Sequence, residues 1–255
     1  MTMSQMRLRQ VCLVAPHLEP VVSDIAAILG LNVCYRDPHV GKYGLENALM
    51  PVEATLLEVV APTQPGTAAG RFMEKSGGRG GYMVILSCED PDERGRFAAN
   101  IGVRTANVID HPPYHGVQLH PRDCRAAFIE FNHTKDSDDD FGPYPPAGPD
   151  WQEAIRHDIT RALTEVELQS PDHYDLAQHW SNIIGVPLTS ARNDDPQIAF
   201  TNGCLRFAKG KSEAMTGITF RVNDVAQVLG SARARGCPCA GDAFLLAGVT
   251  FRVVA

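Results

Sequence analysis

Apolar and polar residues alternate along the chain in one pattern that occurs four times. Each copy starts as a strand-like apolar run, passes through an acidic or polar turn, and continues as an amphipathic segment of roughly three helical turns that stops at a glycine. The four copies span residues 10–30, 82–102, 164–185 and 217–236. Because glycine readily adopts the left-handed conformation that ends a helix, each copy predicts a strand followed by a helix.

The predicted helices also have suitable starting residues. Pro16, Asp90, Asp172 and Asp224 fall where N-caps or first-turn residues belong. With such signals at both ends, the four helices are expected to be short and separate rather than parts of longer ones.

Each copy is followed by strand-like sequence that ends in a short apolar strand, so every copy predicts a βαβββ unit. These last strands span residues 55–61, 127–132, 204–208 and 249–254. Residues 133–151 are rich in Pro, Gly and Asp, which is typical of a linker. We therefore expect an α+β chain of four βαβββ units in two domains, residues 1–133 and 158–255, with a linker at 134–157.

Composition narrows the class of protein. The chain has 255 residues, is 44% hydrophobic and carries a net charge of −7, which is ordinary for a globular protein. No run of Lys and Arg is long enough to neutralise a series of phosphates, so we do not expect a nucleic acid partner. There is no apolar run of membrane-spanning length and no signal-peptide pattern. We expect a cytoplasmic protein without a membrane partner.

Two glutamates interrupt the apolar last strands of the first two copies. Glu58 lies in the stretch LLEVV and Glu130 in FIEFN. A buried carboxylate is costly unless it is paired, so each glutamate either meets a buried arginine or serves in a site.

The repeats and these glutamates together resemble the vicinal oxygen chelate superfamily, which contains glyoxalase I, methylmalonyl-CoA epimerase, extradiol dioxygenases and bleomycin-resistance proteins. The stretch HPRDCRAAFIEFN (120–132) is similar to the end of the epimerases, and NALMPVEATLLEVVAP (47–62) is similar to the glyoxalase-like families. The resemblance covers nearly the whole chain. It implies that two units curl their sheets around a shared cavity, with metal ligands on the first and last strands.

Carried over residue by residue, the resemblance implies metal ligands at Gln10, Glu58, Glu130 and Tyr82. Met83 takes the place of Tyr82 if the turn of the second copy is counted from Asp90. None of these positions holds histidine, although the superfamily usually has at least one. Two carboxylates on one cavity wall raise each other's pKa unless a cation lies between them. We therefore expect a divalent metal ion, Mg²⁺, Mn²⁺, Ni²⁺ or Zn²⁺, and oxygen-only ligands suit the harder Mg²⁺ and Mn²⁺ better.

His120 is a further candidate for proton transfer. If the turn in HPRDCRA is centred on Asp123, His120 faces Ala126 and shares a sheet face with Glu130, whereas a shift of one residue turns it outward. Glu130, Glu58 and His120 are therefore the expected catalytic residues.

The second half differs at the equivalent positions. Glu165 and Gly217 lie on its first strands, and Arg206 and Arg252 on its last strands. A guanidinium group remains protonated and cannot ligate a cation, so we expect no metal there. We expect this half to be a structural duplicate whose arginines pair with Glu165 or with an anion.

Three functions remain open. The first is a metal-dependent lyase, isomerase or epimerase that moves a proton on a small α-hydroxy or α-keto carbonyl substrate, with either of Glu58 and Glu130 as the ligand and the other as the base. The second is a metal-free protein that binds or sequesters a small molecule, as bleomycin-resistance proteins do. The third, an extradiol dioxygenase, is opposed by Glu165, Gly217 and Arg252, which occupy the places of its iron ligands. Because paired assembly is common in proteins of this appearance, a homodimer is among the expected assemblies.

Overall fold

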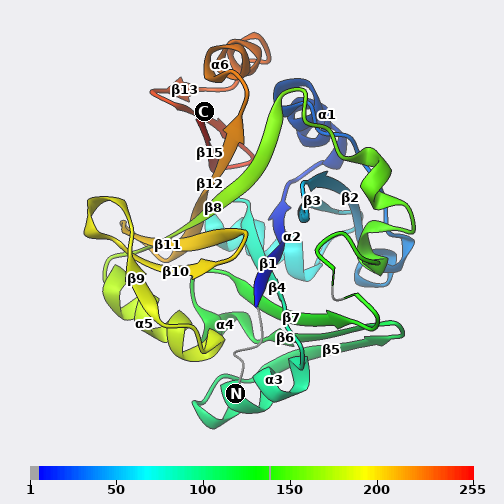
Figure 1. Cartoon of the computed structure of the whole chain (residues 1–255), viewed down its shortest axis with the longest axis vertical. Coiled ribbons are helices and arrows are strands. Elements are labelled where there is room, and N and C mark those ends of the chain that lie inside the picture. The colour runs from blue at the N-terminus through cyan, green and yellow to red at the C-terminus, as the bar shows by residue number, and fades with distance from the viewer. Residues whose placement is uncertain (1–5, 138) are drawn as a thin grey trace. The chain divides into compact units, whose positions relative to one another are not determined.

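The computed structural model describes residues 6–137 and 139–255, and it contains four successive βαβββ repeats (Figure 1). Repeat one departs from this pattern, because the strand expected after its helix is reduced to an isolated bridge between Tyr35 and Leu49. Repeat one and the helix that follows it consist of β1 (Arg7–Val14), α1 (Leu18–Leu29), η1 (Pro38–Tyr43), β2 (Leu45–Val52), β3 (Thr55–Pro62) and α2 (Ala68–Ser76).

The other three repeats have all of the expected strands. Repeat two consists of β4 (Gly81–Ser87), α3 (Pro91–Asn100), β5 (Thr105–His111), β6 (Tyr114–Leu119), α4 (Pro121–Cys124) and β7 (Phe128–Thr134). After η2 (Pro145–Ala147) and η3 (Trp151–Ala154), repeat three consists of β8 (Thr160–Ser170), α5 (His173–Ile184), β9 (Leu188–Ser190), η4 (Arg192–Asp194), β10 (Pro196–Phe200) and β11 (Gly203–Lys209). Repeat four consists of β12 (Ala214–Val222), α6 (Val225–Ala234), β13 (Cys239–Ala240), β14 (Ala243–Leu246) and β15 (Val249–Val254).

The strands pair in the same order within every repeat. The first strand runs parallel to the last strand, which in turn pairs antiparallel with the strand before it. This order places the last strand between two neighbours, so that Glu58 lies opposite Cys12 and Glu130 lies opposite Ile85. Each glutamate is thus flanked on both sides by strands of its own repeat.

Three of the four predicted helix starts are confirmed, whereas the prediction for Pro16 is wrong because the N-cap of α1 is His17. The side chains of Asp90, Asp172 and Asp224 each accept a hydrogen bond from the backbone N–H three residues further on, which satisfies an otherwise unpaired donor of the first turn. Gly30 and Gly185 end their helices with φ of 67° and 77°, in the left-handed region.

Contacts divide the chain into two compact units. Among the described residues, unit 1 contains residues 6–9, 83–137, 139–143 and 165–216, and unit 2 contains residues 10–82, 144–164 and 217–255. Repeats two and three thus make up most of unit 1, whereas repeats one and four make up most of unit 2. The division into domains at the linker 134–157 stays a prediction.

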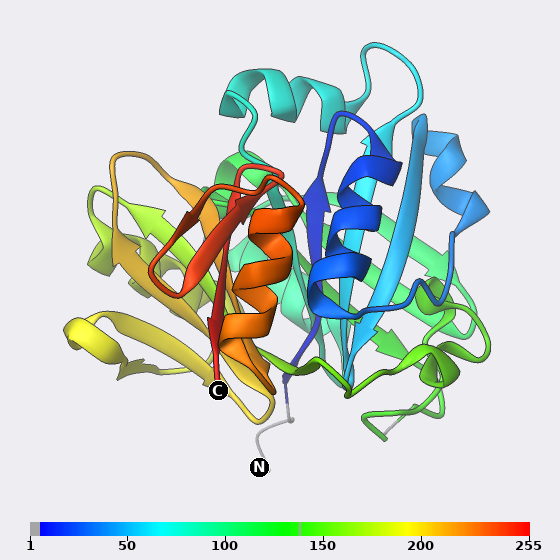
Figure 2. The same ribbon diagram turned by 90° about the horizontal axis from the view of Figure 1, so that it is seen from above.

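In unit 2, the two helices of repeats one and four lie beside each other, α1 in blue and α6 in orange (Figure 2). Arg235 links them through an ion pair with Asp24, at 2.7 Å between Nε and Oδ1. Gly80 joins the two repeats through its backbone, since its oxygen accepts from Val14 N–H and its N–H donates to the Ala247 oxygen. A Cβ at residue 80 would lie 2.3 Å from that oxygen, so only glycine fits.

In unit 1, α5 packs on β10 and β11 (Figure 1). Trp180 on this helix is buried; it contacts the Phe207 ring edge-on and donates from Nε1 to the Cys124 oxygen at 2.8 Å. A tryptophan buried in this way contributes a large apolar area while its one polar group remains paired. None of the helices in the described part of the chain has both the length and the apolar character needed to cross a membrane.

Candidate functional site

Glu58 of unit 2 lies in a network of uncharged hydrogen-bond donors. Gln10 on β1 donates from Nε2 to Glu58 Oε2 at 2.8 Å, and Asn47 on β2 donates from Nδ2 to Glu58 Oε1 at 2.7 Å. Only 7% of Glu58 is exposed. The first and last strands therefore bring Gln10 and Glu58 together, as the sequence predicted, but as hydrogen-bond partners.

The network continues beyond both amides. Tyr144 donates its hydroxyl to Gln10 Oε1 at 2.9 Å, and Asn47 Oδ1 accepts from the backbone N–H of Asp37 at 2.8 Å. Asn47 is thereby oriented, because its oxygen accepts from a backbone N–H and its NH₂ group is directed at Glu58, whereas Gln10 is paired with a hydroxyl, which can donate or accept. Both oxygens of the carboxyl group are fixed by neighbours that carry no charge.

The electrostatic setting of Glu58 favours its protonated form. Burial raises the pKa of Glu58, whereas hydrogen bonds from Asn47, Cys12 and Gln10 lower it in part. Among the described residues, no arginine forms an ion pair with Glu58. The interpretation of Glu58 as the partner of a buried arginine therefore does not apply here.

Tyr82 belongs to the same unit and is buried. Burial is the main cause that raises the pKa of its phenol, and ionisation of Cys12 or Glu58 would raise it further. The ring packs edge-on against Phe72, with 5.0 Å between centroids. Tyr82 thus remains a neutral phenol in the electrostatic neighbourhood of Glu58, and its role as a ligand stays a prediction.

Glu130 of unit 1 has a comparable set of partners. The Tyr114 hydroxyl donates to Oε1, and Gln118 Nε2 donates to Oε2 at 2.8 Å. Asn107 in turn donates to Gln118 Oε1 at 3.1 Å. Only 2% of Glu130 is exposed. Since Glu58 and Glu130 lie in different compact units, their expected convergence on one cavity stays a prediction.

His120 lies past the end of β6, where it is the N-cap of the short helix α4. Its Nδ1 accepts a hydrogen bond from Arg122 N–H at 3.3 Å. The strand register pairs Gln118, rather than residue 116, with Glu130. The register thus differs from the expected one by two residues, which leaves the same side chains on the face of Glu130. Gln118 contacts Glu130, and His120 lies beyond the strand as the N-cap of α4. A catalytic role for His120 stays a prediction.

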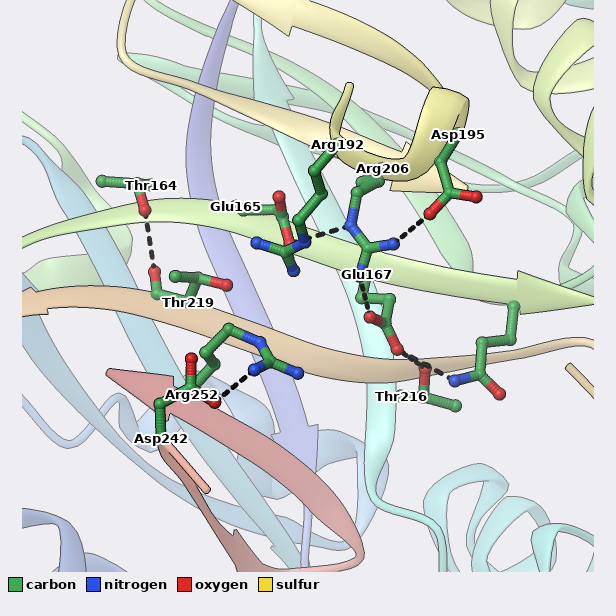
Figure 3. Close-up of polar contacts among 11 residues, drawn as sticks. Thr164, Glu165, Glu167, Arg192, Asp195, Arg206, Thr216, Thr219, Asp242 and Arg252 are labelled. Atoms are coloured by element: carbon green, nitrogen blue, oxygen red, sulfur yellow. Dashed lines mark hydrogen bonds and ion pairs between the residues drawn. The ribbon is translucent and has the colours of Figure 1, made fainter. Parts of the chain in front are cut away.

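Arg206 of unit 1 is enclosed by carboxylates, as Figure 3 shows, and only 4% of its side chain is exposed. It pairs with Glu165 at 3.1 Å between Nε and Oε1, and also with Glu167 and Asp195. Arg192 pairs with the same Glu165 oxygen at 2.7 Å. The expected pairing of Arg206 with Glu165 is therefore confirmed.

In repeat four, the equivalent arginine has a different environment. Arg252 of unit 2 pairs with Asp242, and both side chains are substantially exposed (Figure 3). Gly217 on the first strand has no side chain to offer. Repeat four therefore has neither the carboxylate of repeat three nor a buried arginine.

The residues around Glu58 do not fit a divalent ion as they are arranged. Gln10 directs its NH₂ group, not its oxygen, at the carboxylate, and Asn47 does the same. Divalent cations instead require several oxygen or nitrogen lone pairs directed at one point. Within residues 6–137 and 139–255, no group of three or more His, Cys, Asp or Glu side chains could hold a metal ion.

Several partners of the glutamates were not among the residues predicted from the sequence. Gln118 could have been found, because the expected register already placed even-numbered residues of this hairpin on the face of Glu130. Asn47 is a polar residue in an apolar strand, which is a weaker signal. Tyr144 lies in the segment predicted to be a linker, and nothing in its local sequence indicates that it contacts Gln10.

Neither protein-family models nor curated proteins gave a match to this chain. Three solved structures are similar over most of its length. 4-Hydroxymandelate synthase from Streptomyces coelicolor, solved as a mutant, is 12% identical with a TM-score of 0.68, over 92% of this chain and 76% of that chain. The Mn(II)-bound glyoxalase from Novosphingobium aromaticivorans is 12% identical with a TM-score of 0.66, over 98% of this chain and 82% of that chain. A hypothetical protein from Staphylococcus aureus is 10% identical with a TM-score of 0.67, over 98% of both chains. Together with the four βαβββ repeats, these likenesses show that the chain has the vicinal oxygen chelate fold.

Proposed function

We propose that this protein is a proton-transfer enzyme, a lyase, isomerase or epimerase, that acts on a small α-hydroxy or α-keto carbonyl compound with Glu58 as its acid–base group. The observation that supports this proposal is the buried carboxyl group of Glu58, held through both oxygens by uncharged amides. Proton abstraction next to a carbonyl needs a base whose pKa lies closer to neutrality than that of a free carboxylate.

The uncharged partners matter for the pKa of Glu58. An arginine would orient the carboxylate equally well, but its positive charge would lower the pKa and weaken the base. Gln10 and Asn47 orient the group without adding a charge, while burial raises the pKa. The arrangement thus combines a fixed position with increased basicity.

The two oxygens of Glu58 are not equivalent toward a proton. Asn47 must keep its NH₂ group on Oε1, because its own oxygen accepts from Asp37 N–H. Gln10 can turn its amide over, because a tyrosine hydroxyl such as that of Tyr144 can accept as well as donate. A proton taken up by Glu58 would therefore reside on Oε2 and be donated to the Gln10 oxygen.

No metal ion takes part in the proposed chemistry, because the amide groups beside Glu58 direct N–H donors at it. The glyoxalase of similar fold is a Mn(II)-bound protein. Binding such an ion here would require both amides to turn away from the carboxylate. Elemental analysis of protein purified without chelators is expected to give clearly less than one divalent ion per chain, and a full equivalent would contradict this part of the proposal.

The proposal can be tested by following exchange of the proton next to the carbonyl in D₂O by NMR. The panel consists of hydroxyacetone, dihydroxyacetone, glyceraldehyde and lactate. We expect the wild type to catalyse exchange on at least one compound, and Glu58→Gln to reduce the rate about 10²- to 10⁴-fold. Glu46→Gln, which changes an exposed glutamate of β2, is the matched control and should leave the rate unchanged. Equal rates for Glu58→Gln and wild type would refute the assignment.

A second candidate function is metal-free binding of a small molecule. The donor arrangement around Glu58 favours it, because a network of amides and hydroxyls can recognise a polar ligand without catalysis. Binding of a panel compound without any exchange of its protons would favour this function over the first.

We further propose that the protein works in the cytoplasm on small molecules, without nucleic acid, and as a homodimer. Sedimentation equilibrium measures the assembly directly, since the monomer mass is 27.7 kDa. A monomer at all concentrations would contradict the proposed assembly and leave the chemistry at Glu58 untouched.

A further inference from the structure

A row of three buried polar residues lies along one face of β7 in unit 1. Glu130, Asn132 and Thr134 are two residues apart along this strand and therefore point to the same side of the sheet. Within the described part of the chain, Asn132 Nδ2 and Thr134 Oγ1 have no hydrogen-bond partner. Buried polar atoms are nearly always paired, so two unpaired ones in adjacent places of one row require an explanation.

In the Asn132 side chain, the amide nitrogen is unpaired whereas the amide oxygen is paired. Ser87 Oγ donates to Asn132 Oδ1 at 2.7 Å, and the Asn132 backbone oxygen accepts from Cys88 N–H at 2.9 Å. The asparagine is thus anchored on the β4 side, and its NH₂ group is left as an oriented donor. Asn132 itself is fully buried.

The neighbouring strand carries no side chain opposite Asn132. Gly116 on β6 lies opposite Asn132, and Tyr114 lies opposite Thr134. A Cβ at residue 116 would lie 3.0 Å from Glu130 Oε1 and 3.2 Å from a ring carbon of Tyr114. The absence of a side chain at Gly116 is therefore what lets Tyr114 lean across and bond Glu130.

We propose that Asn132 Nδ2 and Thr134 Oγ1 bind the oxygen atom of a small neutral molecule, namely a ketone, an aldehyde or an alcohol. Both protein groups are uncharged donors suited to a carbonyl or hydroxyl oxygen. An anionic ligand is disfavoured, because Glu130 is the next residue on the same face, about 7 Å along the strand from Asn132. These residues belong to unit 1, so this site can be tested separately from Glu58 of unit 2.

The test uses hydroxyacetone as the neutral probe and lactate as an anion of similar size, with binding measured by ligand-detected NMR. We expect hydroxyacetone to bind the wild type saturably, whereas any binding of lactate should be the same in the wild type and in the two variants below. Asn132→Leu and Thr134→Val should each weaken hydroxyacetone binding about tenfold, the usual effect of losing one hydrogen bond. Thr105→Val, which removes an exposed hydroxyl from β5, is the matched control and should bind as the wild type does.

Thermal unfolding separates a binding role from a structural one. If Thr134 Oγ1 is unpaired in the free protein, replacing it with a methyl group removes an unsatisfied buried group, so Thr134→Val should keep or raise the Tm. Weaker binding together with an unchanged or higher Tm would support the site, even if Asn132→Leu fails to fold. Unchanged binding in Thr134→Val, a Tm below that of the wild type, or no saturable hydroxyacetone binding to the wild type would overturn it.

Discussion

Glu58 and Glu130 could be singled out from the sequence because a charged residue in an apolar strand is rare. Their partners were harder to predict, because they depend on strand register rather than on residue type. Gln10 was expected to share a metal with Glu58, and the structure instead gives a direct hydrogen bond between them. A sequence pattern can place two side chains together without fixing which atoms face each other.

The raised pKa of Glu58 makes the stability of the protein depend on pH. Since the folded state holds this proton more tightly than the unfolded state, whose glutamate pKa is about 4.3, the stabilisation is complete below that pH. It is lost as the pH rises through the folded-state pKa. In urea unfolding, Glu58→Gln should therefore gain in stability relative to the wild type as the pH rises from 4 to 8.

Glu46→Gln is the control for this measurement, because Glu46 is exposed on the same strand as Asn47. Its difference from the wild type should not change with pH. A constant difference for Glu58→Gln as well would show that Glu58 titrates equally in the folded and unfolded states.

Gly116 offers a second test at the scale of one residue. Gly116→Ala places a methyl group against Glu130 and Tyr114, and overpacking of this kind typically costs about 1–3 kcal/mol. Gly230→Ala is the matched control: no atom lies within 4 Å of the added Cβ and the position is inside α6, so it should stabilise by about 0.5–1 kcal/mol. Equal effects of the two substitutions in chemical denaturation would contradict the close contact at Gly116.

At the scale of elements, the sequence predicted the repeats well because each one carries local signals. Asp224 caps α6 and Gly185 ends α5 as expected, and both effects depend on residues within one or two turns. The short helix α4 after His120 was not predicted. It changes the register between β6 and β7 by two residues. Register depends on side chains from separate strands, and a single sequence contains little information on it.

Arg206 and Arg252 occupy the same place in repeats three and four, yet they should differ greatly in their effect on stability. Arg206→Met leaves Glu165, Glu167 and Asp195 without their shared cation, and breaking a buried ion pair typically costs about 3–5 kcal/mol. Arg252→Met breaks one exposed pair, which is typically worth about 1 kcal/mol or less. Urea unfolding of both variants measures the difference, and similar losses would show that the carboxylates of repeat three are stabilised by other means.

At the scale of the whole molecule, the fold class could be predicted because one unit is repeated four times. The grouping of the repeats into compact units could not be predicted, because it depends on contacts between segments far apart in the sequence. Each compact unit takes residues from both halves of the chain, and four of the five boundaries fall inside β1, β4, β8 and β12. A linker composition at 134–157 indicates a connection but not which repeats pack together.

Expression of residues 1–150 alone tests how the repeats are grouped. If each compact unit needs both halves of the chain, this fragment should give poorly dispersed amide signals in NMR and no cooperative unfolding. The full-length protein, measured in parallel, should give dispersed signals. A cooperatively folding fragment would instead support the two domains predicted from the sequence.

The interleaved units also bear on biosynthesis. Residues 10–82 leave the ribosome well before residues 217–255, with which they form one compact unit. At typical elongation rates the interval is on the order of ten seconds, which is long compared with the folding time of a small domain. During that time repeat one lacks the residues of repeat four that belong to the same compact unit, so we expect the nascent chain to bind chaperones until those residues emerge.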